Sequence, residues 1–105
     1  MTKRQVELIP EKVSDEVKAM MDPEGATKAI RFLADEVTQM FRELSEHRSQ
    51  TEGHARQILS RRQTRLLNKL HELFPDNPSI VESAYGLMAP VLETHFERQR
   101  GKKFK

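Results

Sequence analysis

Apolar residues recur at helical spacing soon after the segment Asp22-Pro23-Glu24. That segment favours a helix start, because Asp caps helices, Pro suits the first helical position and Glu favours the positive end of the helix dipole. The apolar positions that follow, in steps of three and four, are Ile30, Leu33, Val37, Met40 and Leu44. Such two-per-heptad spacing is typical of a helix packing on another helix, so these five residues are a predicted helix–helix interface.

Two later stretches repeat the helical spacing. The first carries apolar residues at Ala55, Leu59, Leu66, Leu70 and Leu73, and Pro75-Asp76-Asn77-Pro78 ends it. Ser79 and Glu82 then form a predicted capping box, and a broad apolar stripe follows them. Pro90 lies inside this third stretch opposite the carbonyl of Gly86, which predicts a kink rather than a break.

Two architectures are open for residues 24–74. In one, the chain breaks between Ser49 and Gly53, and helices over 24–47, 54–74 and 79–99 form a three-helix bundle with short connections. In the other, one helix of about 76 Å runs through the segment, because a single Gly costs only about 1 kcal/mol. A helix of that length cannot be covered by the rest of one chain. It requires a coiled-coil-like homodimer with the C-terminal helix folded back.

Both architectures predict an all-α protein with three main amphipathic helices. We expect a flexible N-terminal arm over 1–12, a single helical domain over 13–99 and a basic C-terminal tail over 100–105. The arm carries Val6, Leu8 and Ile9, but no second strand candidate exists to pair with it, so it either moves freely or docks on a groove. A short helix from Val13 is predicted to end near Asp22.

Composition excludes several classes of protein. The chain has 36% hydrophobic and 32% charged residues, no Cys, and no apolar run near the length of a membrane span, so we expect a cytoplasmic protein without thiolate metal sites or disulfides. The net charge of +2 hides a segregation: residues 14–46 carry eight acids and four bases, whereas 95–105 carry five bases and one acid. This asymmetry predicts an acidic partner or head-to-tail pairing between copies.

No pattern predicts an enzyme. The sequence has no glycine-rich phosphate loop, nucleophile elbow or metalloprotease spacing, and we expect no cofactor and no small-molecule substrate. His47 and His54 are seven residues apart, and on a continuous helix they would share a face with Glu43. In a symmetric dimer that face could bind a metal, although a polar layer or two surface histidines explain the same residues.

Basic residues form the most function-like pattern. A stripe at steps of three and four lies on the second stretch, with Arg56 at its edge, and further bases follow in the tail. Together they form a predicted surface for nucleic acid or an acidic partner: Arg56, Arg61, Arg62, Arg65, Lys69, Arg98, Arg100, Lys102 and Lys103. Any exposed helix also shows a charged outer face, and only Phe104 in the tail offers an aromatic ring for stacking.

These patterns favour a protein that acts by binding. We expect a small non-catalytic helical regulator or adaptor that binds a protein partner or a second copy of itself in a homodimer. The second hypothesis is a nucleic-acid-binding protein that uses the basic helix face and the tail. No membrane association is expected.

Overall fold

The computed structural model describes residues 8–46 and 51–103, with side chains described as far as Arg100. Over those ranges the chain is helical and contains no strand, which confirms the all-α prediction. The four helices are α2 (Glu11–Met20), α3 (Pro23–Glu46), α4 (Glu52–Leu73) and α5 (Pro78–Lys103). No described helix is both long enough and apolar enough to cross a membrane.

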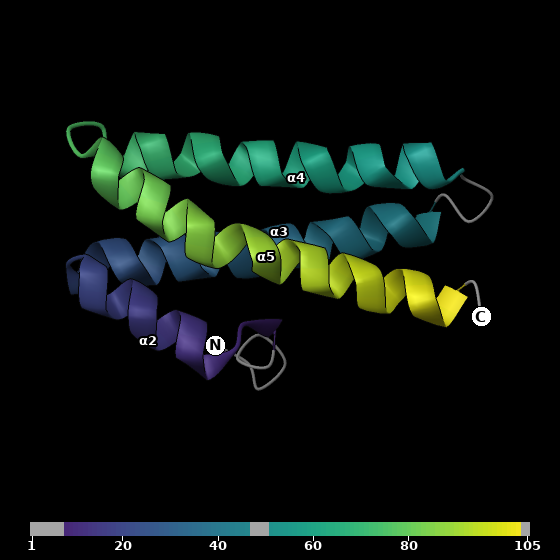
Figure 1. Cartoon of the computed structure of the whole chain (residues 1–105), viewed down its shortest axis with the longest axis horizontal. Coiled ribbons are helices and arrows are strands. Elements are labelled where there is room, and N and C mark those ends of the chain that lie inside the picture. Colours follow the sequence, from purple (N-terminus) through teal and green to yellow (C-terminus); the bar gives the residue numbers. More distant parts are fainter. Residues whose placement is uncertain (1–7, 47–50, 104–105) are drawn as a thin grey trace.

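Helices α3, α4 and α5 pack pairwise, and α2 packs against α3 and α5 (Figure 1). Helix α3 ends at Glu46 and α4 returns antiparallel from Glu52, so residues 24–74 form a hairpin of two helices rather than one continuous helix. The three-helix part of the prediction therefore holds, with α2 as a fourth helix. The homodimer remains a prediction, although the continuous helix that required it does not occur.

Side-chain caps fix where the helices begin. The Gly25 N–H donates to Asp22 Oδ2 at 3.0 Å, and the His54 N–H donates to Thr51 Oγ1 at 3.2 Å. At α5 the prediction of a Ser79–Glu82 capping box is wrong. The helix begins one residue earlier, with Pro78 as its first residue, and Asn77 Oδ1 accepts from the Ile80 N–H at 3.3 Å.

All five residues of the predicted helix–helix interface lie in the core of a single chain. Val37 and Met40 have no exposed surface, and Ile30, the most exposed of the five, retains only 7%. Their neighbours in the core include Leu66 and Leu70 of α4 and Leu92 and Phe96 of α5. The interface that the spacing predicts is therefore made within the chain, between α3 and its two partner helices.

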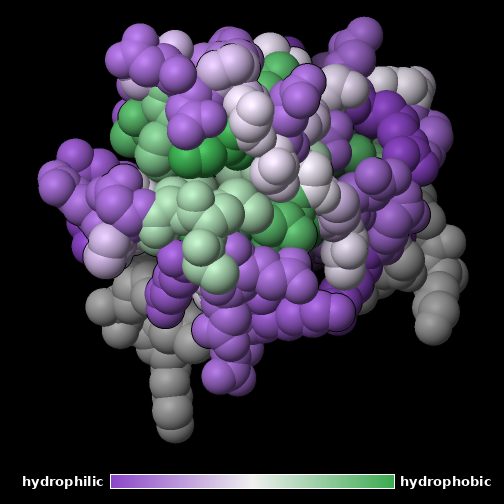
Figure 2. All heavy atoms as spheres, turned by 60° about the vertical axis from the view of Figure 1, so that its left-hand side comes forward, coloured by the Kyte–Doolittle hydropathy of each residue, from purple (hydrophilic) through white to green (hydrophobic). Residues whose placement is uncertain are grey.

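At the end of the bundle that carries the α2–α3 and α4–α5 connections, the Phe74 ring lies close to the backbone of α3 at Gly25. Gly25 is buried in the first turn of α3, and a Cβ built there would lie 2.9 Å from Cζ of Phe74. The absence of a side chain thus lets the Phe74 ring lie against α3. Apolar residues also reach the surface at this end, surrounded by polar ones (Figure 2).

Helix α5 continues through Pro90, as the prediction of a kink without a break requires, and it changes direction partway along its length (Figure 1). Gln63 of α4 donates from Nε2 to the Ala89 carbonyl at 3.3 Å, which ties the two helices together beside the proline. The helix extends to Lys103 and so includes much of the segment expected as a tail. The expected arm is also partly ordered, because α2 begins at Glu11 and Ile9 is buried.

Candidate functional site

Three arginines of the predicted basic surface face carboxylates of α3. Arg62 is 9% exposed and donates from Nη1 to Glu36 Oε2 at 2.8 Å and from Nη2 to Glu43 Oε1. Arg65 donates from Nε to Glu36 Oε1 at 3.1 Å, and Arg61 Nη1 lies 3.9 Å from Glu43 Oε2. We call these five residues the α3–α4 ion network. It shows that this part of the predicted surface binds the protein's own acids.

Arg62 lies at the centre of the α3–α4 ion network. Burial alone would lower the pKa of its guanidinium, but the hydrogen bonds and negative charges of Glu36 and Glu43 outweigh burial and raise it above the ordinary value. Glu36, at 3% exposed, is buried with it. A buried pair of this kind contributes little net stability, yet removing one partner is costly, so it fixes how α4 docks on α3.

Arg56 and Arg100 belong to a second cluster of interactions within the chain, where the start of α4 lies beside the C-terminal part of α5. Both guanidinium groups lie over the fully buried ring of Phe96, at 5.1 and 5.8 Å from its centroid. Glu52 pairs with both arginines, and Glu97 accepts from Arg56 at 3.0 Å. These two cations therefore stabilise the contact between α4 and α5 rather than lying free on the surface.

The remaining basic residues have different surroundings. Lys69 lies over the ring of Phe32, at 5.6 Å from its centroid, and pairs with no acid in the described part of the chain. Within that same part, Arg98 takes part in no ion pair, hydrogen bond or ring contact, and it is exposed. The side chains of Lys102 and Lys103 lie outside the described residues.

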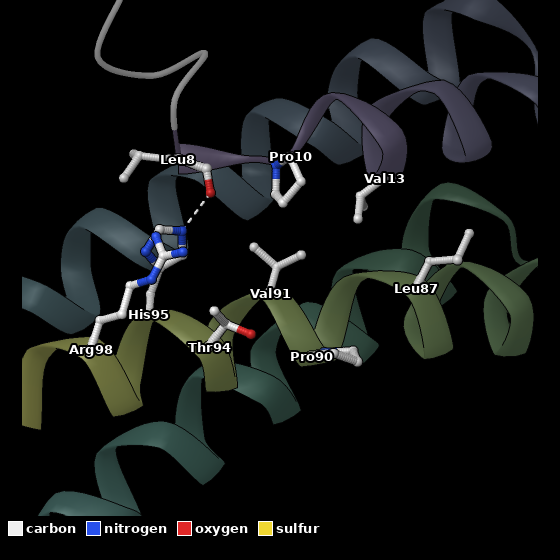
Figure 3. A pocket seen from close by; sticks show the side chains of 9 residues that line it. All are labelled: Leu8, Pro10, Val13, Leu87, Pro90, Val91, Thr94, His95 and Arg98. Carbon is white, nitrogen blue, oxygen red and sulfur yellow. Dashed lines mark hydrogen bonds between the residues drawn. The ribbon is translucent and has the colours of Figure 1, made fainter. Parts of the chain in front are cut away.

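Arg98 borders an apolar groove between the N-terminal segment and α5 (Figure 3). One wall is formed by residues 8–10 and the start of α2, and the other by α5. Figure 3 shows Leu87 and Val13 toward one end of the groove and His95 and Arg98 toward the other. The α2–α5 groove is lined by Leu8, Pro10, Val13, Leu87, Pro90, Val91, Thr94, His95 and Arg98.

His95 holds the N-terminal wall in place. Its Nε2 donates to the Leu8 carbonyl, with 2.5 Å between the two atoms, and its ring meets that of Phe41 edge to face. His95 is only 8% exposed, and Ile9 next to the bonded carbonyl is 4% exposed. Residues 8–10 are thus held by a hydrogen bond to α5 and by the burial of Ile9 in the core, which makes the wall a defined surface.

The size of the groove limits what it can bind. Its volume is about 180 Å³, whereas small-molecule sites commonly measure about 300–1,000 Å³. It has room for one or two apolar side chains. No group of three or more potential metal ligands occurs in residues 8–46 or 51–103, and His47 of the predicted metal face lies outside them. Glu43 of that face instead pairs with Arg62.

Sequence reasoning placed Arg98 in a basic tail and missed its apolar neighbours. The signal available was the α5 spacing of Leu87, Val91 and Arg98, which share one helix face at intervals of four and seven. The opposite wall gave no comparable signal, because nothing in the pattern pairs residues 8–13 with α5.

In comparisons with protein-family models, curated proteins and solved structures, none matches the chain.

Proposed function

We propose that the protein is a non-catalytic helical adaptor that binds a short apolar segment of a partner protein in the α2–α5 groove. The observation that carries this proposal is the position of an exposed Arg98 guanidinium, unpaired within the described residues, at one end of an apolar hollow. The proposal keeps the adaptor function expected from the sequence. It moves the binding surface from the helix–helix interface, which is internal, to the groove.

The apolar lining supports a protein partner over a metabolite. Side chains such as Leu8, Val13 and Leu87 pack against the core and remain partly exposed in the groove. A volume suited to one or two side chains matches the anchor residues by which peptide segments occupy grooves, at spacings such as i and i+4. The walls then recognise shape and apolar character.

Charge specifies the other feature of the partner. Arg98 lies one turn after His95 and Thr94 on α5, and among the described residues no acid lines the groove. An arginine fork binds a carboxylate through two parallel hydrogen bonds, and the neighbouring apolar surface strengthens that pair by excluding water. The partner segment therefore carries an Asp or Glu beside its apolar anchor.

A phage-displayed peptide library tests this proposal while the partner is still unidentified. Selection on the wild-type protein is expected to yield peptides with an apolar anchor followed closely by Asp or Glu. Selection on Arg98→Glu is expected to yield the same anchor with Lys or Arg in place of the acid, because the swap reverses the charge that the groove recognises. A Leu87→Ser variant is expected to lose the anchor preference.

The matched control is Arg42→Glu, at an exposed arginine on α3 that does not line the α2–α5 groove. It should select the same peptides as wild type. Peptides that bind wild type, Arg98→Glu and Leu87→Ser equally well would contradict the proposal, as would a selection that yields no enriched sequence.

A further inference from the structure

A second hollow lies between α3 and α4, and none of its lining residues belongs to the α2–α5 groove. Its volume is about 240 Å³, and its lining is Phe32 of α3 with Arg65, Asn68, Lys69 and Glu72 of α4. In Figure 1 α4 and α2 lie at opposite edges of the bundle, with α3 and α5 between them. The two sites can therefore be occupied or disrupted separately.

The cations of this hollow are incompletely neutralised. In the α3–α4 ion network three guanidinium groups share two carboxylates, and the side chain of Arg65 is 56% exposed. Lys69 has the Phe32 ring as its partner rather than an acid. An anion that enters the hollow thus meets positive charge from two consecutive turns of α4.

The aromatic ring gives the hollow a second property. Phe32 packs against the core but remains partly exposed, so its ring borders the hollow next to Lys69. Glu72 also lines the hollow, and its carboxylate disfavours a bare phosphate ion. The same carboxylate can accept a hydrogen bond from an amino group on a planar ring. A stacking surface and positive charge are the features by which proteins bind single-stranded nucleic acid, and the Glu72 acceptor adds a contact for an exocyclic amine.

We propose that this hollow binds a nucleotide unit of a single-stranded nucleic acid. The base stacks on Phe32, its exocyclic amine donates to Glu72, and the phosphate pairs with Arg65 and Lys69. Lys69 moves from the ring face to the phosphate as the base takes its place. This assignment adds an aromatic residue of α3 to the basic helix face and does not depend on the α2–α5 groove.

Fluorescence anisotropy with a labelled oligodeoxycytidine of about 12 nucleotides tests the site, because cytosine carries an exocyclic amine. Phe32→Leu is expected to weaken binding by about 5- to 150-fold, the range for loss of one base–aromatic stack. Phe32→Tyr keeps a ring and is expected to retain binding. Phe41→Leu, a matched change at another partly buried phenylalanine of α3, is expected to bind like wild type.

The salt dependence tests the two cations separately from the ring. The affinity for a single strand falls as salt rises, and each lost phosphate contact makes the slope of log K against log salt less negative by about 0.7. Lys69→Gln and Arg65→Gln should each show that change, whereas Lys28→Gln, at an exposed lysine paired with Glu24, should not. Circular dichroism of every variant checks that the helices are retained.

Two results would overturn the proposal: no binding by wild type at about 100 μM protein in about 50 mM salt, or equal losses for Phe32→Leu and Phe41→Leu. Saturable binding of cytidine monophosphate that Phe32→Leu removes would support the site and assign it to free nucleotides. Binding of the oligonucleotide alone, with the same sensitivity, supports the site and assigns it to a polymer.

Discussion

The α3–α4 ion network and the α2–α5 groove both contain arginine beside apolar side chains, and they differ in what the arginine binds. Arg62 is buried, and two carboxylates of the same chain accept its hydrogen bonds. Arg98 is exposed, borders a hollow of about 180 Å³, and has no such partner in the part of the chain that the structure describes. A cation buried against acids of its own chain, as Arg62 is, therefore does not indicate a binding surface, and the exposed cations are the candidates.

Replacing Arg62 should lower the stability of the fold, whereas replacing Arg98 should lower the affinity for a partner and leave stability unchanged. The largest effect is expected at Arg62. Arg62→Met is expected to lower the free energy of unfolding by about 3–5 kcal/mol, because the buried Glu36 then loses its buried charge partner and keeps the half-exposed Arg65. Urea denaturation followed by circular dichroism measures the change. Arg42→Met, at an exposed arginine of α3, is the control and should change stability by less than about 0.5 kcal/mol. A loss below about 1 kcal/mol for Arg62→Met would contradict a structural role for the network.

Removing both buried charges gives a second test of the network. The double variant Glu36→Leu with Arg62→Met is expected to recover most of the stability lost in Arg62→Met, because no unpaired charge then remains in the interior. Glu43, whose side chain is 21% exposed, can turn toward water. The same urea titration compares the two variants, and a further loss in the double variant would show that the ion pair itself supplies net stability.

An intermediate effect is expected at His95, where the groove is built. His95→Phe keeps a ring against Phe41 but removes the hydrogen bond to the Leu8 carbonyl, so the loss in unfolding free energy should be about 1 kcal/mol. Amide hydrogen exchange should become faster at Leu8 and Ile9 while the α3 core is unchanged. His71→Phe, at an exposed position of α4, serves as the control. Unchanged exchange at Leu8 and Ile9 would mean that His95 does not hold the wall.

The smallest effect on stability is expected at Arg98. Arg98→Gln removes an exposed charge that pairs with no acid in residues 8–46 or 51–100, so the free energy of unfolding should stay within about 0.5 kcal/mol of wild type. Affinity for a peptide selected on the groove should nevertheless fall about ten-fold, which corresponds to about 1.4 kcal/mol of binding energy. Urea denaturation and fluorescence anisotropy measure the two quantities. A clear loss of stability would place Arg98 among the structural cations instead.

Much of the fold could be predicted from local patterns. The spacing of Ile30 to Leu44 placed the core face of α3, and Asp22 and Pro75-Asp76-Asn77-Pro78 marked helix ends close to the observed ones. The choice between a hairpin and one long helix was not local. A single Gly53 costs too little to break a helix, and the break depends on the Thr51 cap together with the packing of α4 on α3 and α5.

The candidate sites were less predictable because their residues are distant in sequence. Arg62 and its partner Glu36 are 26 residues apart, and Leu8 and His95 are 87 apart. The spacing on α4 predicts one stripe of arginines, but it could not show that Arg62 faces inward while Arg61 and Arg65 are exposed. Glu36 and Glu43 are seven residues apart, so they lie on the same face of α3. That they lie opposite the arginines of α4 follows only once the α3–α4 hairpin is known.

The central question, whether Arg98 is a recognition residue, is best answered by a double-mutant cycle across the groove. Isothermal titration calorimetry would combine wild type or Arg98→Glu with a groove-selected acidic peptide or the same peptide carrying Lys in place of its acid. We predict tight binding for the two opposite-charge pairs and losses of about ten-fold or more for the two like-charge pairs. Equal affinity of all four pairs would contradict recognition by Arg98 and leave the groove without a binding role for its exposed arginine.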